Sequence, residues 1–173
     1  IAKGFQIVQA YGNWIPSTII GALLPIMVMF GIHTAVAPVG LLQLTSLGYE
    51  GIFGPGAMVS NIGMAVATLV ASFRTKDNTA RQISTSNGIT ALMGITEPAL
   101  YGTALPKRYP LIAAIIGGGI GGFYAGITNT VRYATGTSGL PAVTLYIGGN
   151  MSSFRNILIA ICITAITTGV CAY

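Results

Sequence analysis

Residues 94–102 read Gly-Ile-Thr-Glu-Pro-Ala-Leu-Tyr-Gly, so a carboxylate, Glu97, and a proline, Pro98, stand between two glycines inside an apolar stretch. A carboxylate at membrane depth is costly unless it is paired or hydrated, and such a residue is functional by default. Proline withholds a backbone N–H and pushes the preceding residue out of the helical region, so we expect the helix to break at Glu97. Non-helical backbone at membrane depth is tolerated only where it is buried in protein or lines a watery cavity. Both arguments predict a polar ligand site in this stretch.

The composition is typical of a polytopic helical membrane protein. Hydrophobic residues make up 53% of the 173 positions and charged residues only 6%, whereas soluble domains carry roughly 25% charged residues. The few charged residues lie at the ends of long uncharged runs, as in successive membrane spans. The net charge of +5 comes from basic residues scattered between apolar segments. Because these residues form no patch, the sequence argues against nucleic acid as a partner.

We expect an all-α integral membrane protein with about four full transmembrane helices and several broken or re-entrant segments. A span needs about 20 apolar residues, and the expected crossings are 15–30, 51–73, 109–131 and 156–173. Small residues recur in the second stretch and glycines crowd the third, so both predict close helix packing. Residues 1–14 suit an interfacial segment because of their amphipathic tryptophan, Trp14. Residues 140–151 are apolar but short, and they predict a partial insertion.

Two cationic clusters set the expected topology. Residues 74–81 carry the densest group of charges, residues 107–108 carry the next one, and the positive-inside rule assigns both to the cytoplasm. The intervening residues 82–106 number about 25, whereas two full spans would need about 40. We therefore expect a re-entrant hairpin whose tip lies near Glu97 and Pro98. Short or broken segments of this kind indicate binding sites in transporters.

A second broken segment, residues 31–47, contains the only histidine of the chain, His33, together with Pro38. It would dip partway into the membrane and return, or run as a broken segment. A lone histidine is ordinarily a satisfied core residue or an interfacial one, and the residues alone leave that reading open. The position of His33 in a Gly/Pro-broken apolar run, like that of Glu97, favours a polar-ligand role.

The nine residues 94–102 resemble the signature of enzyme IIC, the membrane-embedded sugar permease of bacterial phosphoenolpyruvate-dependent phosphotransferase systems. Within the glucose superfamily, the chain is most similar to the beta-glucoside and sucrose branch. Residues 30–33, Phe-Gly-Ile-His, followed by Pro38, are similar to the upstream histidine motif of that family. Residues 105–110 resemble the basic segment that follows the signature. The sequence departs from many relatives at Thr34, where an aromatic residue is common.

The resemblance implies that residues 1–173 are the C-terminal sugar-binding portion of a permease in the bacterial inner (cytoplasmic) membrane. The N-terminal half, which would be needed for the homodimer, and the IIB and IIA domains would then be absent. The implied partners are a beta-glucoside, sucrose or a related sugar, and a IIB domain that carries a phosphocysteine. Neither cysteine of this chain resembles that phosphocysteine, so we expect no catalytic residue here and no phosphotransferase activity from the chain alone.

Sugar hydroxyls both donate and accept hydrogen bonds, and the candidate residues match that chemistry. Glu97 can accept bonds from two adjacent hydroxyls, and His33 can donate from one nitrogen and accept at the other. The resemblance implies that these two hold the sugar while its 6-hydroxyl is presented to the IIB domain. The remaining candidates are Thr96 and Pro98 beside Glu97 and, with less support, Asn87 and Tyr101.

The competing function is an ion-coupled secondary transporter in which Glu97 is a proton or cation site. Coupling usually needs a relay of intramembrane acids, and the sequence indicates only Glu97. A non-transporting helical scaffold is the third reading, and it leaves the broken helices unexplained. We expect no cofactor and no metal: Cys162 and Cys171 lie roughly 13 Å apart along one helical run and on opposite faces, so both are expected to be small core residues.

Overall fold

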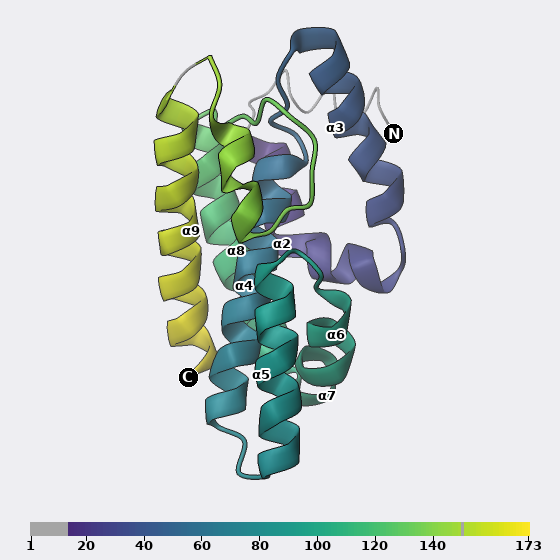
Figure 1. Cartoon of the computed structure of the whole chain (residues 1–173), viewed down its shortest axis with the longest axis vertical. Helices are drawn as coiled ribbons and strands as arrows, with labels where there is room; N and C mark the ends of the chain where they lie inside the picture. Colours follow the sequence, from purple (N-terminus) through teal and green to yellow (C-terminus); the bar gives the residue numbers. More distant parts are fainter. Residues whose placement is uncertain (1–13, 150) are drawn as a thin grey trace.

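The computed structural model describes residues 14–149 and 151–173, and helices are the regular elements of this part. Four helices pack against one another as a bundle: α2 (Trp14–Met29), α4 (Gly54–Phe73), α8 (Tyr109–Ile127) and α9 (Met151–Ala172). Helix α3 (His33–Leu47) lies beside the upper part of this bundle in the view of Figure 1. Helix α5 (Asn78–Leu92) extends the bundle at its lower end. The expected all-α fold is confirmed. The interfacial segment expected over residues 1–14 lies, except for Trp14, outside the described residues.

Three helices of the described part, α4, α8 and α9, are long and apolar enough to cross a membrane. The fourth expected crossing is α2, whose 16 residues reach about 24 Å and fall short of the roughly 30 Å of a bilayer core. The chain turns after Met29 because Gly31 adopts a φ of 69°, a left-handed conformation that favours glycine. The membrane-crossing core therefore contains three long helices with the shorter α2 beside them.

Close contacts with neighbouring helices confirm the packing role of the glycines in α8. A Cβ atom at Gly118 would lie 2.2 Å from the carbonyl oxygen of Gly21 in α2. A Cβ atom at Gly121 would lie 1.8 Å from Thr164 Oγ1 in α9. Both positions therefore require glycine, which lets neighbouring helices approach closely. The small residues that were expected to form a packing face of α4 are all buried: Gly56, Ser60, Gly63 and Ala67.

Helix α3 is a separate helix, and the break in this region lies before it rather than inside it. Residues 30–32 form the turn from α2, and α3 then continues without interruption past Pro38. It ends at Gly48, whose φ is 76° and whose N–H donates to the carbonyl oxygen of Leu44 at 2.8 Å. Only four residues of α3 are buried, so most of its surface is open.

The hairpin expected over residues 82–106 is present, and its helices extend from residue 78 to residue 107. After α5, the chain turns over residues 93–96 and continues through α6 (Glu97–Ala99), the π-helix η1 (Leu100–Ala104) and α7 (Leu105–Lys107). Of these, α6 and η1 pack back against α5. The expectation that the helix breaks at Glu97 was wrong. The turn centres on Gly94, whose φ is 95°, and Glu97 begins the next helix. Pro98 fits there because the first N–H groups of a helix have no partner within it.

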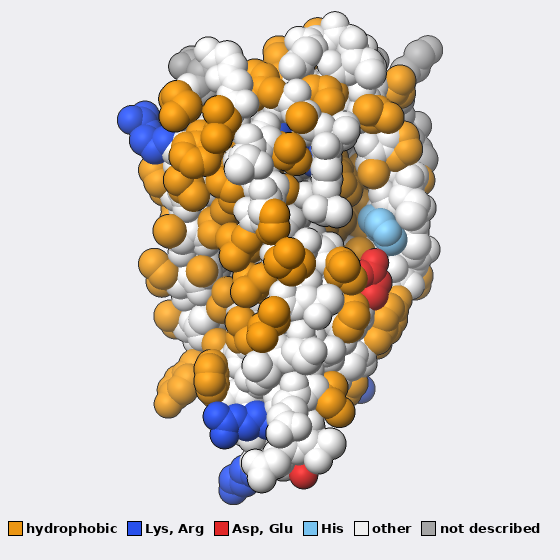
Figure 2. Space-filling view, viewed as in Figure 1, with side chains coloured by type: hydrophobic (Ala, Val, Ile, Leu, Met, Phe, Trp, Pro, Cys, Tyr) orange, Lys and Arg blue, Asp and Glu red, His pale blue; other side chains and the backbone are white. Residues whose placement is uncertain are grey.

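The two cationic clusters lie at the same end of the molecule. The ammonium group of Lys107 donates to Thr75 Oγ1 across the hairpin. The guanidinium of Arg74 lies 5.0 Å from the ring centroid of Tyr109 and donates to the carbonyl oxygen of Ala172 at 3.0 Å. Basic side chains accordingly gather at the narrow end of the molecule, below a largely hydrophobic surface (Figure 2). This shared end agrees with the expected re-entrant path.

The last part of the chain differs from expectation in two details. The apolar stretch after residue 139 forms a short 3-10 helix, η2 (Leu140–Tyr146), and α9 already begins at Met151. The prediction that Cys162 and Cys171 are core residues was wrong, because both are free and exposed. Helix α9 lies at the edge of the bundle and buries a single face, and these cysteines lie outside it.

Candidate functional site

Glu97 lies exposed at the first turn of α6. Its carboxylate forms no hydrogen bond and no ion pair with any described residue. Thr96, the residue before it, is only 8% exposed, and Pro98, the residue after it, is exposed. The turn therefore presents an acceptor group that is not committed to the fold.

Asn87 and Tyr101 have different surroundings. The amide of Asn87 donates to Thr103 Oγ1 at 3.5 Å, and the Thr103 hydroxyl donates to Ser84 Oγ at 3.2 Å. These contacts join α5 to η1 and hold the two arms of the hairpin together. Tyr101 is exposed on η1. The direct role of Asn87 in ligand binding thus stays a prediction, since its amide already has a partner inside the hairpin.

His33 begins α3 and is partly buried. Its Nδ1 atom is buried and has no hydrogen-bond partner within the described part of the chain. Buried polar atoms are almost always hydrogen-bonded, and an exception calls for an explanation. Figure 2 shows the histidine side chain and an acidic side chain on the same face of the molecule.

The loop of residues 132–139, between α8 and η2, lies against the hairpin tip. A Cβ atom at Gly139 would lie 2.5 Å from the backbone nitrogen of Gly94, so the two backbones touch directly. The side-chain amide of Asn61, in α4, donates to the carbonyl oxygen of Ser138 at 2.8 Å. The turn that precedes Glu97 is thereby held by α4 through this loop.

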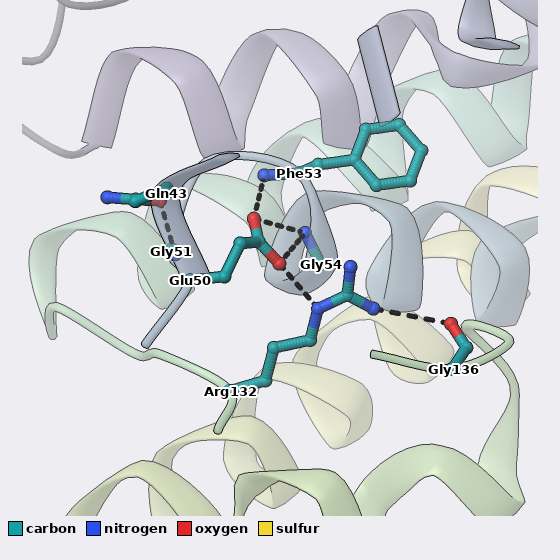
Figure 3. A network of polar contacts seen from close by, with 7 residues as sticks. All are labelled: Gln43, Glu50, Gly51, Phe53, Gly54, Arg132 and Gly136. Atoms are coloured by element: carbon teal, nitrogen blue, oxygen red, sulfur yellow. Dashed lines mark hydrogen bonds and ion pairs between the residues drawn. The ribbon is translucent and has the colours of Figure 1, made fainter. Parts of the chain in front are cut away.

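The same loop carries Arg132, which forms a buried ion pair with Glu50 (Figure 3). Glu50 is 0% exposed and Arg132 is 6% exposed. The Glu50 carboxylate accepts bonds from Arg132 Nε and from the backbone N–H groups of Phe53 and Gly54, at the start of α4. Arg132 also donates to the carbonyl oxygen of Gly136 at 3.4 Å. An anion at a helix N-terminus is stabilised by the free N–H groups and the helix dipole.

Backbone contacts reinforce the ion pair. The N–H of Glu50 donates to the carbonyl oxygen of Arg132 at 2.8 Å, and the reciprocal bond has the same length. Gln43, in α3, accepts a bond from the N–H of Gly51 at 3.0 Å. The connection from α3 to α4 and the loop after α8 are therefore fastened together.

Sequence reasoning missed this pair. It considered Glu50 and Arg132 only as two of the charged residues that lie at the ends of long uncharged runs. The two residues are 82 positions apart, and no local spacing indicates that they meet. The sequence offered one hint of a buried pair, since both charged residues adjoin apolar segments with glycines nearby. Gly54 leaves room for the pair, because a Cβ atom there would lie 2.3 Å from Arg132 Nε.

A cleft of about 490 Å³ opens between α3 and the loop that carries Arg132. We refer to it as the α3 cleft, and it is lined by Thr34, Ala37, Pro38, Leu41, Phe53, Arg132, Thr135 and Gly136. Its volume is in the range of small-molecule sites, roughly 300–1,000 Å³. The described residues contain no cluster of three or more His, Cys, Asp or Glu side chains that could hold a metal ion.

Comparison with protein families decides the identity of the chain. The family model "Phosphotransferase system, EIIC" matches residues 1–118. The chain belongs to this family. EIIC is a membrane domain, in agreement with the all-α fold and the apolar spans, and the family that the sequence resembles is thereby confirmed.

Curated relatives of this EIIC chain are components of beta-glucoside and sucrose systems. The beta-glucoside-specific EIIBCA component of Bacillus subtilis (strain 168) is 29% identical over 149 residues, which cover 86% of this chain and 24% of that protein. The sucrose-specific EIIBC component of Pasteurella multocida (strain Pm70) is 38% identical over 134 residues, 76% of this chain and 28% of that protein.

The sucrose-specific EIIBC component of Bacillus subtilis (strain 168) matches across the whole chain, with 26% identity over 173 residues and 37% of its own length. The EIIC chain thus spans about a quarter to somewhat over a third of the length of these relatives. No solved structure matches it.

Proposed function

We propose that this chain is the C-terminal, sugar-binding and translocating portion of an EIIC permease in the inner (cytoplasmic) membrane of a bacterium. In this role it holds a beta-glucoside, sucrose or a related sugar while the 6-hydroxyl receives a phosphoryl group from a phosphocysteine on a IIB domain. The observation that carries the proposal is the Glu97 carboxylate: it lies in the stretch that resembles the EIIC signature, at the start of α6, without a partner among the described residues. The names of the relatives, beta-glucoside-specific EIIBCA and sucrose-specific EIIBC, support the sugar class and the IIB partner.

Glu97 and His33 supply complementary hydrogen-bonding groups. The carboxylate accepts bonds from two neighbouring sugar hydroxyls, and bonds to an ionised acceptor are about twice as strong as neutral ones. The buried Nδ1 of His33, which has no protein partner among the described residues, gains one from a hydroxyl. Thr96 adds a hydroxyl beside Glu97, and Pro98 fixes the first turn of α6 that presents the carboxylate.

The chemistry is phosphoryl transfer, but the reacting groups do not belong to this chain. The nucleophile is the sugar hydroxyl and the phosphoryl donor belongs to the IIB domain, so the contribution of the chain is to hold the hydroxyl in position. We accordingly infer that residues 1–173 alone do not phosphorylate sugar. The homodimer is assigned in the same way to the full-length permease.

The alternative function is ion-coupled transport through Glu97. The structure shows a further acid, Glu50, that such a mechanism could use. Glu50 is buried, but its carboxylate is occupied by Arg132 and by two backbone N–H groups. A relay site has to be free to bind a proton or a cation, whereas these partners already occupy both oxygens of the Glu50 carboxylate. Glu50 therefore adds no support for a relay.

The deciding experiment measures sugar uptake by the full-length protein in membrane vesicles. With phosphoenolpyruvate and the phosphotransferase components present, we expect sugar phosphate to accumulate from at least one of a beta-glucoside, sucrose, trehalose or glucose. A protonophore should leave this accumulation unchanged. Uptake that collapses with the protonophore and proceeds without phosphoenolpyruvate would establish the ion-coupled alternative.

A further inference from the structure

The relatives of this chain are named for sugars that share one chemical feature. Their names include sucrose, trehalose, arbutin, cellobiose and salicin. Each of these is a glucosyl ring joined through its anomeric carbon to a second group, either another sugar ring or a substituted phenol. A site that grips one ring through Glu97 and His33 leaves the second group to be accommodated elsewhere.

We propose that the α3 cleft binds this second group, and that Arg132 and Thr135 donate hydrogen bonds to it. The inference rests on the proposed function and deepens it, because it names the part of the ligand that the cleft takes and the residues that select it.

The two walls of the cleft carry side chains that suit a sugar ring or a phenyl ring. Thr34, Pro38 and Leu41 are spaced three or four residues apart, so they share one face of α3. The loop after α8 contributes Arg132 and Thr135, and the ring of Phe53 adds an aromatic surface. Sugar rings and phenyl rings combine an apolar face with a hydroxyl-bearing edge, so a lining of apolar and aromatic groups with a few placed donors fits them.

Arg132 provides an observation that is independent of the cleft. Its side chain is more than nine-tenths buried, yet only Nε, to Glu50, and one terminal nitrogen, to Gly136, are hydrogen-bonded. The other terminal nitrogen has no contact in the network of Figure 3. A guanidinium has five N–H donors. This terminal nitrogen is not one of the buried polar atoms that lack a partner, so its donors are accessible to an acceptor in the cleft. A hydroxyl of a ligand in the cleft would pair them.

The charge of the cleft also selects its ligand. Glu50 neutralises Arg132 through the buried pair, and the remaining lining residues are uncharged. The cleft therefore offers donors without a net charge, which suits a neutral hydroxyl-bearing group and gives little attraction to a phosphate or a carboxylate.

The cleft and the predicted ring site share their supporting elements. Helix α3 carries His33 and, from the next residue onward, one wall of the cleft. The loop of residues 132–139 forms the other wall and lies against Gly94, three residues before Glu97. One glycoside can thus extend from the pair Glu97 and His33 into the cleft.

The test compares a one-ring ligand with two-part ligands in the full-length permease. Dissociation constants are measured for methyl glucoside and for salicin, sucrose and trehalose. The variant Leu41→Trp fills the cleft from its α3 wall, and Leu42→Trp is the matched control, since Leu42 is the next residue of α3, is 59% exposed and does not line the cleft.

We expect Leu41→Trp to weaken binding of the two-part ligand about tenfold or more, and binding of methyl glucoside less than about twofold. Leu42→Trp should change neither. Thr135→Val removes one hydroxyl at almost constant volume, so it should weaken binding of the two-part ligand alone, by about threefold to tenfold. This second variant tests the proposal even if Leu41→Trp misfolds.

Equal losses for both ligand types, or no loss in Leu41→Trp and Thr135→Val, would overturn the proposal. Either result would mean that the second group of the glycoside does not bind in the cleft. Failure of the proposed function is a separate outcome, because the unsubstituted permease would then phosphorylate none of the sugars.

Discussion

Glu97 and Glu50 are two carboxylates in the same apolar chain, and their surroundings are opposite. Glu50 is 0% exposed and binds one guanidinium and two backbone N–H groups. Glu97 is exposed at a helix start and has no polar partner among the described residues. Both glutamates follow a left-handed glycine by two or three residues, Gly48 and Gly94, so the local backbone does not separate them. What separates them is whether the rest of the fold supplies donors.

The comparison separates a charge that belongs to the structure from a charge that is available to a ligand. A buried carboxylate is stable only when its partners are complete, and removal of one partner leaves an uncompensated charge. A carboxylate without protein partners has to be hydrated or to bind a ligand. Substitutions should therefore lower the free energy of unfolding at Glu50 and lower ligand affinity at Glu97.

The largest effect is expected at Glu50. Glu50→Ala removes one partner of a buried ion pair and should lower the free energy of unfolding by about 3–5 kcal/mol. Denaturant titration of the purified protein in detergent measures this loss. Asp77→Ala is the matched control, because Asp77 also accepts an N–H at a helix start, from Ala80 at 2.7 Å, but is exposed; it should cost only about 1 kcal/mol.

An equal loss of unfolding free energy in Glu50→Ala and Asp77→Ala would contradict this prediction. It would show that Glu50 stabilises the protein only as a helix cap, without a contribution from burial or from the guanidinium. The double variant Glu50→Ala with Arg132→Met should regain part of the stability, since the unpaired cation is removed as well.

The second effect concerns affinity and spares stability. Glu97→Gln keeps the volume and one acceptor but loses the charge-assisted bonds to sugar hydroxyls, so sugar affinity should fall about tenfold to hundredfold. Equilibrium binding to the full-length permease measures this loss, and the midpoint of denaturant unfolding should stay unchanged. Unchanged affinity with normal folding would assign the signature to structure and place the sugar elsewhere.

His33→Gln serves as the companion variant and should cost less affinity than Glu97→Gln. If both residues contact one sugar, the double variant should lose less than the sum of the two single losses, because residues that share a ligand are coupled. Strict additivity would separate the two sites.

The last prediction concerns topology, and it expects no difference in labelling between the two ends of the hairpin. Single cysteines at Asp77 and Lys107, in a chain whose exposed Cys162 and Cys171 are first replaced by serine, should react alike with an impermeant maleimide in sealed vesicles. The contact of Lys107 with Thr75 supports this outcome. Labelling from opposite sides would contradict the re-entrant hairpin. It would also contradict the inference that Glu97 lies at membrane depth.

The features of the fold that could be predicted from the sequence depend on the length of a segment or on the size of a side chain. Residues 82–106 are too few for two crossings, and the hairpin is the path that remains. Glycine at positions such as 118 and 121 indicates that a neighbouring helix needs the space, and Gly21 and Thr164 occupy it.

The features that escaped prediction depend on contacts between distant segments or on the choice among several helix breakers. The pairing of Glu50 with Arg132 joins two loops and leaves no periodic pattern in the sequence. Pro38 was expected to lie in a broken segment, yet α3 passes through it because the chain had already turned at Gly31. Likewise, Gly94 rather than Pro98 ends the first arm of the hairpin, since a proline fits the first turn of a new helix.

The π-helix η1 determines the direction in which the Glu97 side chain points. Helices α6, η1 and α7 form one continuous rod, in which the N–H of Leu105 reaches back five residues to the carbonyl oxygen of Leu100. Such a turn is the equivalent of one extra residue in an α-helix, and one residue corresponds to about 100° of rotation. Deleting a single residue from this turn would leave Lys107 at its anchor and swing Glu97 about a quarter-turn around the rod. The angular setting of the carboxylate is therefore encoded by the number of residues between Glu97 and Lys107, and the first three residues of the π-helix, Leu100, Tyr101 and Gly102, belong to the signature itself.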